Sequence, residues 1–206
     1  TSIIIPESVI SIGTRAFYYC GSIVVDASNT VFSSEDGVLY DKAMTVLIKY
    51  PGRKSGGFTI PNSVTRIGDY AFSECSGLTS VTIPNSVTNI GNWAFQACSG
   101  LTSVVIPNSV TNIGIRTFSA CTGLTSIIIP DSVTRIGDYA FCSCTGLTSV
   151  IIPNSVTSIG ENAFLYCIGL TSVIIGNSVT SIADWAFYQC SGLTRAYFLG
   201  NAPSMG

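Results

Sequence analysis

Short apolar runs recur along this chain, separated by serine, threonine, asparagine and glycine. The unit at residues 101–123 reads LTSVVIPNSVTNIGIRTFSACTG, and in its first run Leu101, Val104 and Ile106 are compatible with a strand, with Val104 and Ile106 two residues apart. The alternation predicts a short strand, which ends at Pro107 because proline cannot donate to a sheet ladder. A second extended stretch follows, in which Val110 and Ile113 are expected to point inward.

The last part of the unit, IRTFSAC, places Phe118 and Cys121 three residues apart. This spacing predicts that both side chains lie on one side of a single helical turn, too short to be an independent helix. Gly114 and Gly123 allow tight corners before and after it. Each unit is therefore expected to form one coil that consists of a strand, an extended run and a short helical turn.

This unit repeats with a period of 23 residues. In six successive units, a phenylalanine recurs every 23 residues and is followed three residues later by a cysteine. The pairs are Phe72 and Cys75, Phe95 and Cys98, Phe118 and Cys121, Phe141 and Cys144, Phe164 and Cys167, and Phe187 and Cys190. A fixed period of this length indicates a solenoid, in which each coil buries its apolar side against its neighbours.

The predicted fold is a single repeat solenoid over residues 1–206. A parallel β-sheet with strands about 4.8 Å apart forms one face, and short helical turns and extended segments form the other. The nine strands are expected near residues 2–5, 22–25, 57–60, 79–83, 102–106, 125–129, 148–152, 171–175 and 194–198.

One unit, at residues 22–55, departs from the repeat. Asp36-Gly37 is a hairpin turn signal between two strand-like runs. We expect a β-hairpin that projects from the solenoid and is closed by the Pro51-Gly52 turn. This hairpin either covers a flank of the solenoid or offers a side platform to a partner.

The pattern L-x-x-V-x-I-P-x-x-V-x-x-I-G-x-x-A-F-x-x-C-x-G resembles the BspA type of leucine-rich repeat, also called the Treponema pallidum type. The resemblance covers residues 56–199 almost continuously and residues 1–21 as a first partial repeat. It implies a curved right-handed solenoid and surface or secreted proteins of bacteria and some protozoa, often adhesive. Because Ile3-Ile4-Ile5 lacks the polar cap of a free solenoid end, we expect a fragment of a longer protein that extends before Thr1.

Composition then excludes several function classes. The chain has 9 basic and 11 acidic residues, a net charge of −2 and no histidine. Scattered charge provides no binding surface for nucleic acid or an anionic membrane, and apolar runs such as Ile127–Ile129 are too short to span a bilayer. Without histidine there is no Ser-His-Asp or Cys-His machinery and no histidine metal ligand. We expect no enzymatic activity, no catalytic residue, no cofactor and no metal.

Eight cysteines raise the question of disulfides. In an extracellular chain they could form four. Seven of them, beginning with Cys20, occupy one position of the repeat, which favours free thiols packed as small apolar side chains. Cys142 is extra; Cys142-Ser143-Cys144 has the wrong spacing for a zinc pair, and we expect Cys142 to be an exposed thiol that points away from Cys144.

Two further positions of the repeat, three and two residues before each phenylalanine, each form a column of equivalent residues on successive coils. The first reads Asp69, Asn92, Ile115, Asp138, Glu161, Asp184, and the second reads Tyr70, Trp93, Arg116, Tyr139, Asn162, Trp185. Carboxylates about 5 Å apart on successive coils could form a glycosidase pair or hold calcium, but capping of free N–H groups at the start of a helical turn is the simpler interpretation. The aromatic residues either pack over the coil edge or form a platform for sugar.

On the strand face, the residue between two buried ones points to the other side of the sheet. The candidate partner-binding residues are Ile4, Thr82, Val105, Ile128, Ile151, Ile174, Tyr197 and, in the neighbouring column, Arg195. This stripe reflects either plain β-propensity or an interaction surface. We expect a cell-surface or secreted module that binds a protein, such as a host matrix protein or another cell's surface, or a second copy of itself. The alternatives are a structural spacer that presents another domain and a carbohydrate-binding or carbohydrate-active protein.

Overall fold

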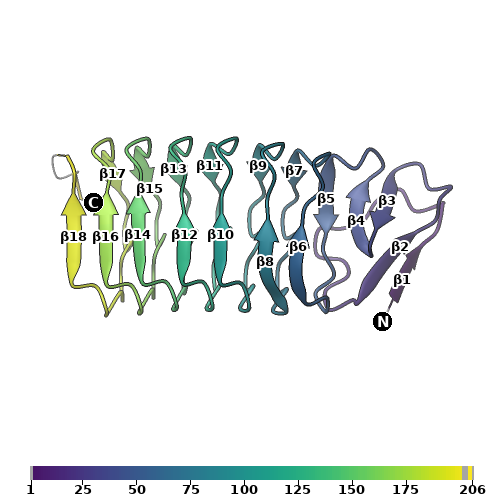
Figure 1. Cartoon of the computed structure of the whole chain (residues 1–206), viewed down its shortest axis with the longest axis horizontal. Helices are drawn as coiled ribbons and strands as arrows, with labels where there is room; N and C mark the ends of the chain where they lie inside the picture. The colour runs from purple at the N-terminus through teal and green to yellow at the C-terminus, as the bar shows by residue number, and fades with distance from the viewer. Residues whose placement is uncertain (1, 201–203, 206) are drawn as a thin grey trace.

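The computed structural model describes residues 2–200 and 204–205, and it is an elongated stack of coils (Figure 1). Nine strands within residues 2–200 form the long row of the stack, close to the predicted positions. They are β1 (Ser2–Ile5), β2 (Ser22–Val25), β6 (Gly56–Thr59), β8 (Leu78–Thr82), β10 (Ser103–Val105), β12 (Ser126–Ile128), β14 (Ser149–Ile152), β16 (Ser172–Ile175) and β18 (Arg195–Phe198). All their pairings are parallel: β1 with β2, β6 with β8, β10 with β12, β14 with β16, and β16 with β18.

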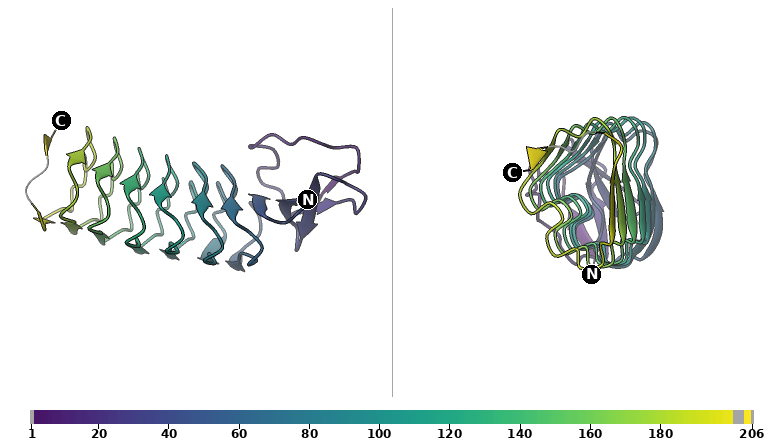
Figure 2. Two further views of the ribbon diagram at one scale, coloured as in Figure 1. Left: turned by 90° about the horizontal axis from the view of Figure 1, so that it is seen from above. Right: turned by 90° about the vertical axis from the view of Figure 1, so that its left-hand side faces the viewer.

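The second extended stretch of each coil forms a second row of shorter strands, seen behind the first in Figure 1. This row consists of β5 (Val46–Lys49), β7 (Arg66–Ile67), β9 (Asn89–Ile90), β11 (Asn112–Ile113), β13 (Arg135–Ile136), β15 (Ser158–Ile159), β17 (Ser181–Ile182) and β19 (Ser204–Met205). Its pairings are again parallel. A view along the stack shows successive coils superposed around one interior (Figure 2).

The predicted short helical turns are wrong, because no helix occurs among residues 2–200. Tyr70 and Glu74 have φ angles of 57° and 63°, which interrupt a right-handed helix. Alternate N–H groups bond within the coil, as from Ser73 to the Tyr70 carbonyl, while Phe72 N donates at 2.7 Å to Ala94 O of the next coil. The turns therefore bond adjacent coils to each other instead of forming isolated helical turns.

The interior between the two strand rows is a continuous stack of apolar side chains. The first five phenylalanines of the repeat are fully buried, and successive rings lie 4.8 to 5.5 Å apart with interplanar angles of 13° or less. Phe187 ends the column half-buried. Each ring thus has aromatic neighbours on both sides except at the ends of the array.

The irregular unit contains the predicted hairpin, formed by β3 (Phe32–Glu35) and β4 (Val38–Asp41). Its turn residues Asp36 and Gly37 both have positive φ, 50° and 77°, as the two-residue type I′ turn requires. The expectation that the hairpin projects from the solenoid is wrong. Val38 and Leu39 are fully buried, and β4 pairs with β5, which pairs in parallel with β7. The hairpin is therefore an extension of the second strand row that closes the core.

Lys49 and Tyr50 explain how this unit replaces a regular coil. In the repeats, the carbonyl one residue before each phenylalanine accepts an N–H from the preceding coil. At the first such turn, Tyr50 N donates to Ala71 O at 2.8 Å instead. The buried Lys49 Nζ donates to Tyr70 O at 3.1 Å and to Ser73 O at 3.4 Å. Ala71 O and Ser73 O correspond to carbonyls that accept N–H groups from the preceding coil in the later repeats, so Tyr50 and Lys49 cap acceptors that the missing coil would otherwise have satisfied. Tyr70 O already accepts from Ser73 N within its own turn, and the bond from Lys49 is an additional one.

Candidate functional site

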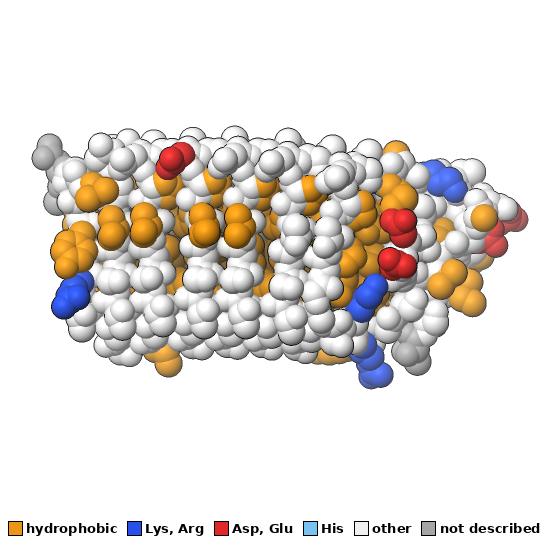
Figure 3. Space-filling model, in the orientation of Figure 1, with side chains coloured by type: hydrophobic (Ala, Val, Ile, Leu, Met, Phe, Trp, Pro, Cys, Tyr) orange, Lys and Arg blue, Asp and Glu red, His pale blue; other side chains and the backbone are white. Residues whose placement is uncertain are grey.

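The strand row presents an apolar stripe, which we define as Val105, Ile128, Ile151, Ile174 and Tyr197. Ile174 is half-buried, and the other four side chains are 59%, 61%, 62% and 52% exposed. Val105 pairs with Ile128, and Ile151 pairs with Ile174, which pairs with Tyr197. Between β12 and β14 the stripe borders a hollow of about 420 Å³, which Ile128 and Ile151 help to line. Figure 3 shows the resulting row of hydrophobic side chains along the stack.

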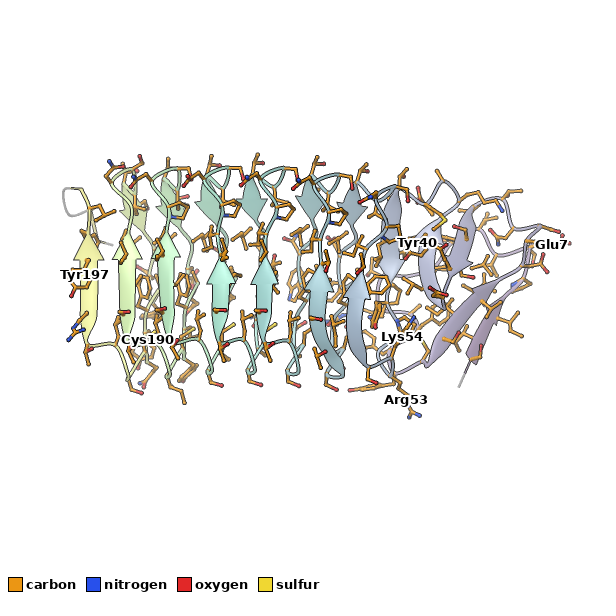
Figure 4. All side chains as sticks on the ribbon, in the orientation of Figure 1. Glu7, Tyr40, Arg53, Lys54, Cys190 and Tyr197 are labelled. Carbon is orange, nitrogen blue, oxygen red and sulfur yellow. The ribbon has the colours of Figure 1, made fainter. Side chains whose placement is uncertain are left out.

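The apolar stripe gives way to polar residues beyond one end, and at its other end its last member is an aromatic residue. Thr82 is exposed and pairs with Thr59, so the row becomes polar beyond Val105. At the opposite end Tyr197 lies on β18 (Figure 4), and Arg195 is exposed on the same strand. The five apolar positions are thus a contiguous group, with Thr82 and Arg195 flanking it.

Ile4 does not belong to this stripe, although it is exposed. It pairs with Val24 of β2, which is also exposed, and the hairpin β3–β4 and β5 lie between these two strands and β6 (Figure 1). Val24 was not among the predicted partner-binding residues, although the run SIVV matches SIII of the first strand. Ile4 and Val24 form a second, smaller apolar patch.

The surroundings of the stripe are mostly uncharged. Ser103, Ser126 and Ser149 are exposed on the same strands, two residues before its members. On this face most charged side chains lie toward the two ends of the stack (Figure 3), and Asp131 is the acidic residue that lines the hollow with Ile128 and Ile151. The stripe therefore suits apolar contact edged by hydroxyl groups, and long-range electrostatic attraction of a charged partner contributes little there.

The acidic column caps backbone N–H groups, but between coils and not at the start of a helix. Asp69 Oδ1 accepts from Asn92 N at 3.0 Å, and Asp138 Oδ1 accepts from Glu161 N at 3.0 Å. Asn92 Oδ1 accepts in the same way from Ile115 N. Over the part of the chain that the structure describes, no three acidic, cysteine or histidine side chains are grouped to hold a metal ion. These side chains contribute to coil stacking.

The first half of the aromatic column packs over the coil edge. The rings of Tyr70 and Trp93 are stacked, with centroids 5.1 Å apart and an interplanar angle of 10°. The Arg15 guanidinium lies 4.7 Å from the centre of the Tyr70 ring, and the Arg116 guanidinium lies 4.3 Å from that of Tyr139. Face-to-face contact along the stack is therefore the arrangement of this part of the column.

The column cysteines are buried free thiols, as the packing interpretation predicts. Cys121 Sγ donates to Phe95 O of the preceding coil at 3.0 Å, and Cys144 Sγ donates to Phe118 O at 3.1 Å. Burial raises the pKa of the Cys121 thiol to about 12. Cys142 is half-buried, with its sulfur 3.5 Å from Ser143 Oγ, and so is less exposed than we predicted.

No helix within the described residues is long and apolar enough to cross a membrane. A family model described as the BspA type leucine-rich repeat region matches six copies, over residues 1–51, 49–145 and 121–206. No curated protein matches the chain.

Solved structures of bacterial leucine-rich repeat proteins share the fold. A protein from Eubacterium ventriosum is 32% identical with a TM-score of 0.89, covering 94% of this chain and 53% of its own. A leucine-rich cell surface protein from Faecalibacterium prausnitzii is 32% identical with a TM-score of 0.67, covering 98% and 48%. A T. pallidum leucine-rich repeat protein is 30% identical with a TM-score of 0.75, covering 88% and 85%. The chain spans about half the length of the first two.

Proposed function

The chain belongs to the BspA type leucine-rich repeat family, and from this membership we propose that it is a non-enzymatic module that binds a protein through its apolar stripe. Repeat solenoids of this kind typically serve protein interaction, because stacked coils create an extended, regular binding surface. The observation that carries the proposal is the row of exposed apolar side chains on consecutive strands. Contiguous apolar surface of this kind is characteristic of interaction sites.

The stripe also has the composition of a binding centre. Ile128 and Ile151 border the hollow between β12 and β14, and Tyr197 adds an aromatic ring at the end of the row. Tyrosine and arginine are enriched among the residues that dominate binding energy, and Arg195 lies beside Tyr197 on β18. The partner that fits best is a protein with an uncharged apolar surface, such as an extracellular matrix protein.

We place this activity at the cell surface or outside the cell. One solved relative, 32% identical, is a cell surface protein. A surface-exposed location would bring the stripe into contact with matrix proteins or with the surface of another cell. The stripe is also available to a second copy of the chain.

Replacing Ile128 and Ile151 together with lysine is expected to weaken binding to a matrix protein by about 100-fold or more, because two ammonium groups would have to be desolvated where apolar side chains were buried. Surface plasmon resonance against a panel of immobilised extracellular matrix proteins measures the loss. Sedimentation velocity tests self-association of the same variant. The far-ultraviolet circular dichroism spectrum should be unchanged, since both side chains are exposed.

The matched control adds the same two charges on two adjacent coils away from the strands. Ser99 and Thr122 are exposed at corresponding corners, and Ser99→Lys with Thr122→Lys should bind as the wild type does. Equal binding by the strand-face variant and the wild type would reject the stripe as the binding site. A wild-type protein that binds neither a matrix protein nor itself would favour the spacer role.

A further inference from the structure

A second concave site lies on the turns of three successive coils, apart from the strand row. It is a hollow of about 350 Å³ with an aromatic lining. Its lining residues are Tyr139, Asn162, Leu165, Tyr166, Trp185 and Tyr188. Trp185 is 62% exposed, and Tyr166 and Tyr188 are also exposed. Exposed aromatic rings around a hollow offer apolar faces with polar edges, as ligand sites commonly do.

The hollow exists because asparagine interrupts the aromatic column. Tyr139, Asn162 and Trp185 occupy the same position on three consecutive coils. Where two aromatic residues are neighbours in this column, as Tyr70 and Trp93 are, the rings stack directly at 5.1 Å. With the small Asn162 between them, Tyr139 and Trp185 are two coils apart, a separation of about 10 Å.

A slot of this width accepts one saturated sugar ring. Carbon atoms in contact lie about 3.5–4 Å apart, so a guest touching both aromatic rings is about one pyranose ring thick. The far face of Tyr139 is occupied by the Arg116 guanidinium, 4.3 Å from the ring centre. Tyr139 therefore has its other face available toward Asn162 and the hollow.

The floor of the hollow supplies hydrogen bonds. Asn162 is buried, and its Nδ2 donates to Glu161 Oε1 at 2.9 Å. A carboxamide has two N–H donors and one oxygen acceptor, so a single bond to Glu161 leaves capacity for the hydroxyl groups of a ligand. No lysine or arginine is among the lining residues, while Glu161 and Asp184 lie in the column beside them. This balance disfavours anionic ligands.

We propose that this hollow binds a neutral glycan built of β-linked glucose, with one ring held between Tyr139 and Trp185 above Asn162. β-Glucose carries all its hydroxyl groups equatorially, so both faces of its ring present C–H groups to the two aromatic side chains. Its hydroxyl edge meets the Asn162 amide on the floor of the hollow. The site is separate from the apolar stripe and uses none of its residues.

Affinity electrophoresis tests this binding directly. The wild-type protein is expected to be retarded in gels that contain laminarin or hydroxyethylcellulose, and to migrate freely in gels that contain the anionic alginate. Trp185→Ala should weaken the affinity for the glucan in the gel at least about tenfold, because one of the two aromatic contacts to the sugar ring is lost. Trp93→Ala removes the other tryptophan from the same column outside the hollow, and it should retain binding.

Fluorescence gives a second readout, because the chain has two tryptophans. In a Trp93→Phe variant, Trp185 is the sole tryptophan, and titration with cellopentaose or laminaripentaose should shift its emission saturably. The proposal would be overturned if neither glucan slowed the migration of the wild-type protein. It would also be overturned if the Trp185→Ala variant bound a glucan as tightly as the wild type does. Neither outcome bears on the apolar stripe, because the substituted residues are not part of it.

Discussion

Raising the pH above 9 is expected to unfold this protein within about one to three pH units. Burial raises the pKa of Cys75 and Cys121 to about 12, and raises the pKa of Cys98 and Cys144 well above 9.0. A thiol whose pKa is raised on folding stabilises the folded state fully below its unfolded pKa. That contribution is lost as the pH rises toward the folded pKa, because the unfolded chain ionises first.

The expected effect is large because the same thiol position is repeated. Above pH 9, ionisation of each thiol in the unfolded chain reduces the free energy of unfolding by about 1.4 kcal/mol per pH unit. Four such thiols together reduce it by about 5 to 6 kcal/mol per pH unit. A domain stable by about 5–15 kcal/mol should then unfold within about one to three pH units. Guanidinium titrations from pH 7.5 to 11 measure the slope. An unfolding free energy that stays constant up to pH 11 would refute this prediction.

A single substitution tests the assignment to the cysteine column. Cys121→Val removes one ionisable group from the core, so the slope above pH 9 should fall by about 1.4 kcal/mol per pH unit. Lys49 acts in the opposite direction: desolvation lowers its pKa from 10.5, so its contribution to stability increases as the amine becomes neutral. One lysine opposes four thiols, and the net loss remains steep.

Phe118→Ala is expected to destabilise the protein by about 3–5 kcal/mol. Phe118 is fully buried, and its ring stacks on Phe95 at 5.3 Å and on Phe141 at 5.5 Å. Truncation leaves a cavity in the middle of the stack, and the coils on both sides are hydrogen-bonded and cannot collapse into it. Thermal and guanidinium unfolding at pH 7.5 measure the change.

The matched control is the same substitution at the end of the column. Phe187 is half-buried and has one stacked neighbour, Phe164 at 5.1 Å. Phe187→Ala should therefore reduce the free energy of unfolding by less than half as much as Phe118→Ala. Equal effects at the two positions would show that stacking between coils adds nothing to the stability of the array.

The repeat made much of the fold predictable. A period of 23 residues places equivalent side chains on adjacent coils, so the burial of Phe118 and Cys121 and the pairing of Val105 with Ile128 follow from position alone. The turns were not predictable in detail. Tyr70 and Trp93 have φ angles of 57° and 54°, and bulky residues rarely adopt this left-handed conformation, so residue type gave no signal for it.

The irregular unit depends on long-range pairing, which local pattern does not reveal. Its hairpin turn was evident from Asp36-Gly37, but burial of the hairpin comes from the pairing of β5 with β7. The same unit separates β1, which carries Ile4, from the strands of the stripe (Figure 1). A platform for sugar was one interpretation of the aromatic column, but the hollow between Tyr139 and Trp185 was not predicted, although one signal was present: Asn162 in a column of mostly aromatic residues.

Hydrogen–deuterium exchange of the complex with the matrix protein that binds most tightly tests whether the strand row is the interaction surface. We expect slower exchange on binding in peptides that contain β10, β12 and β14, with unchanged exchange in the turns around Phe118 and Phe141. Protection confined to the turns, with no change over these three strands, would contradict the assignment of binding to the apolar stripe.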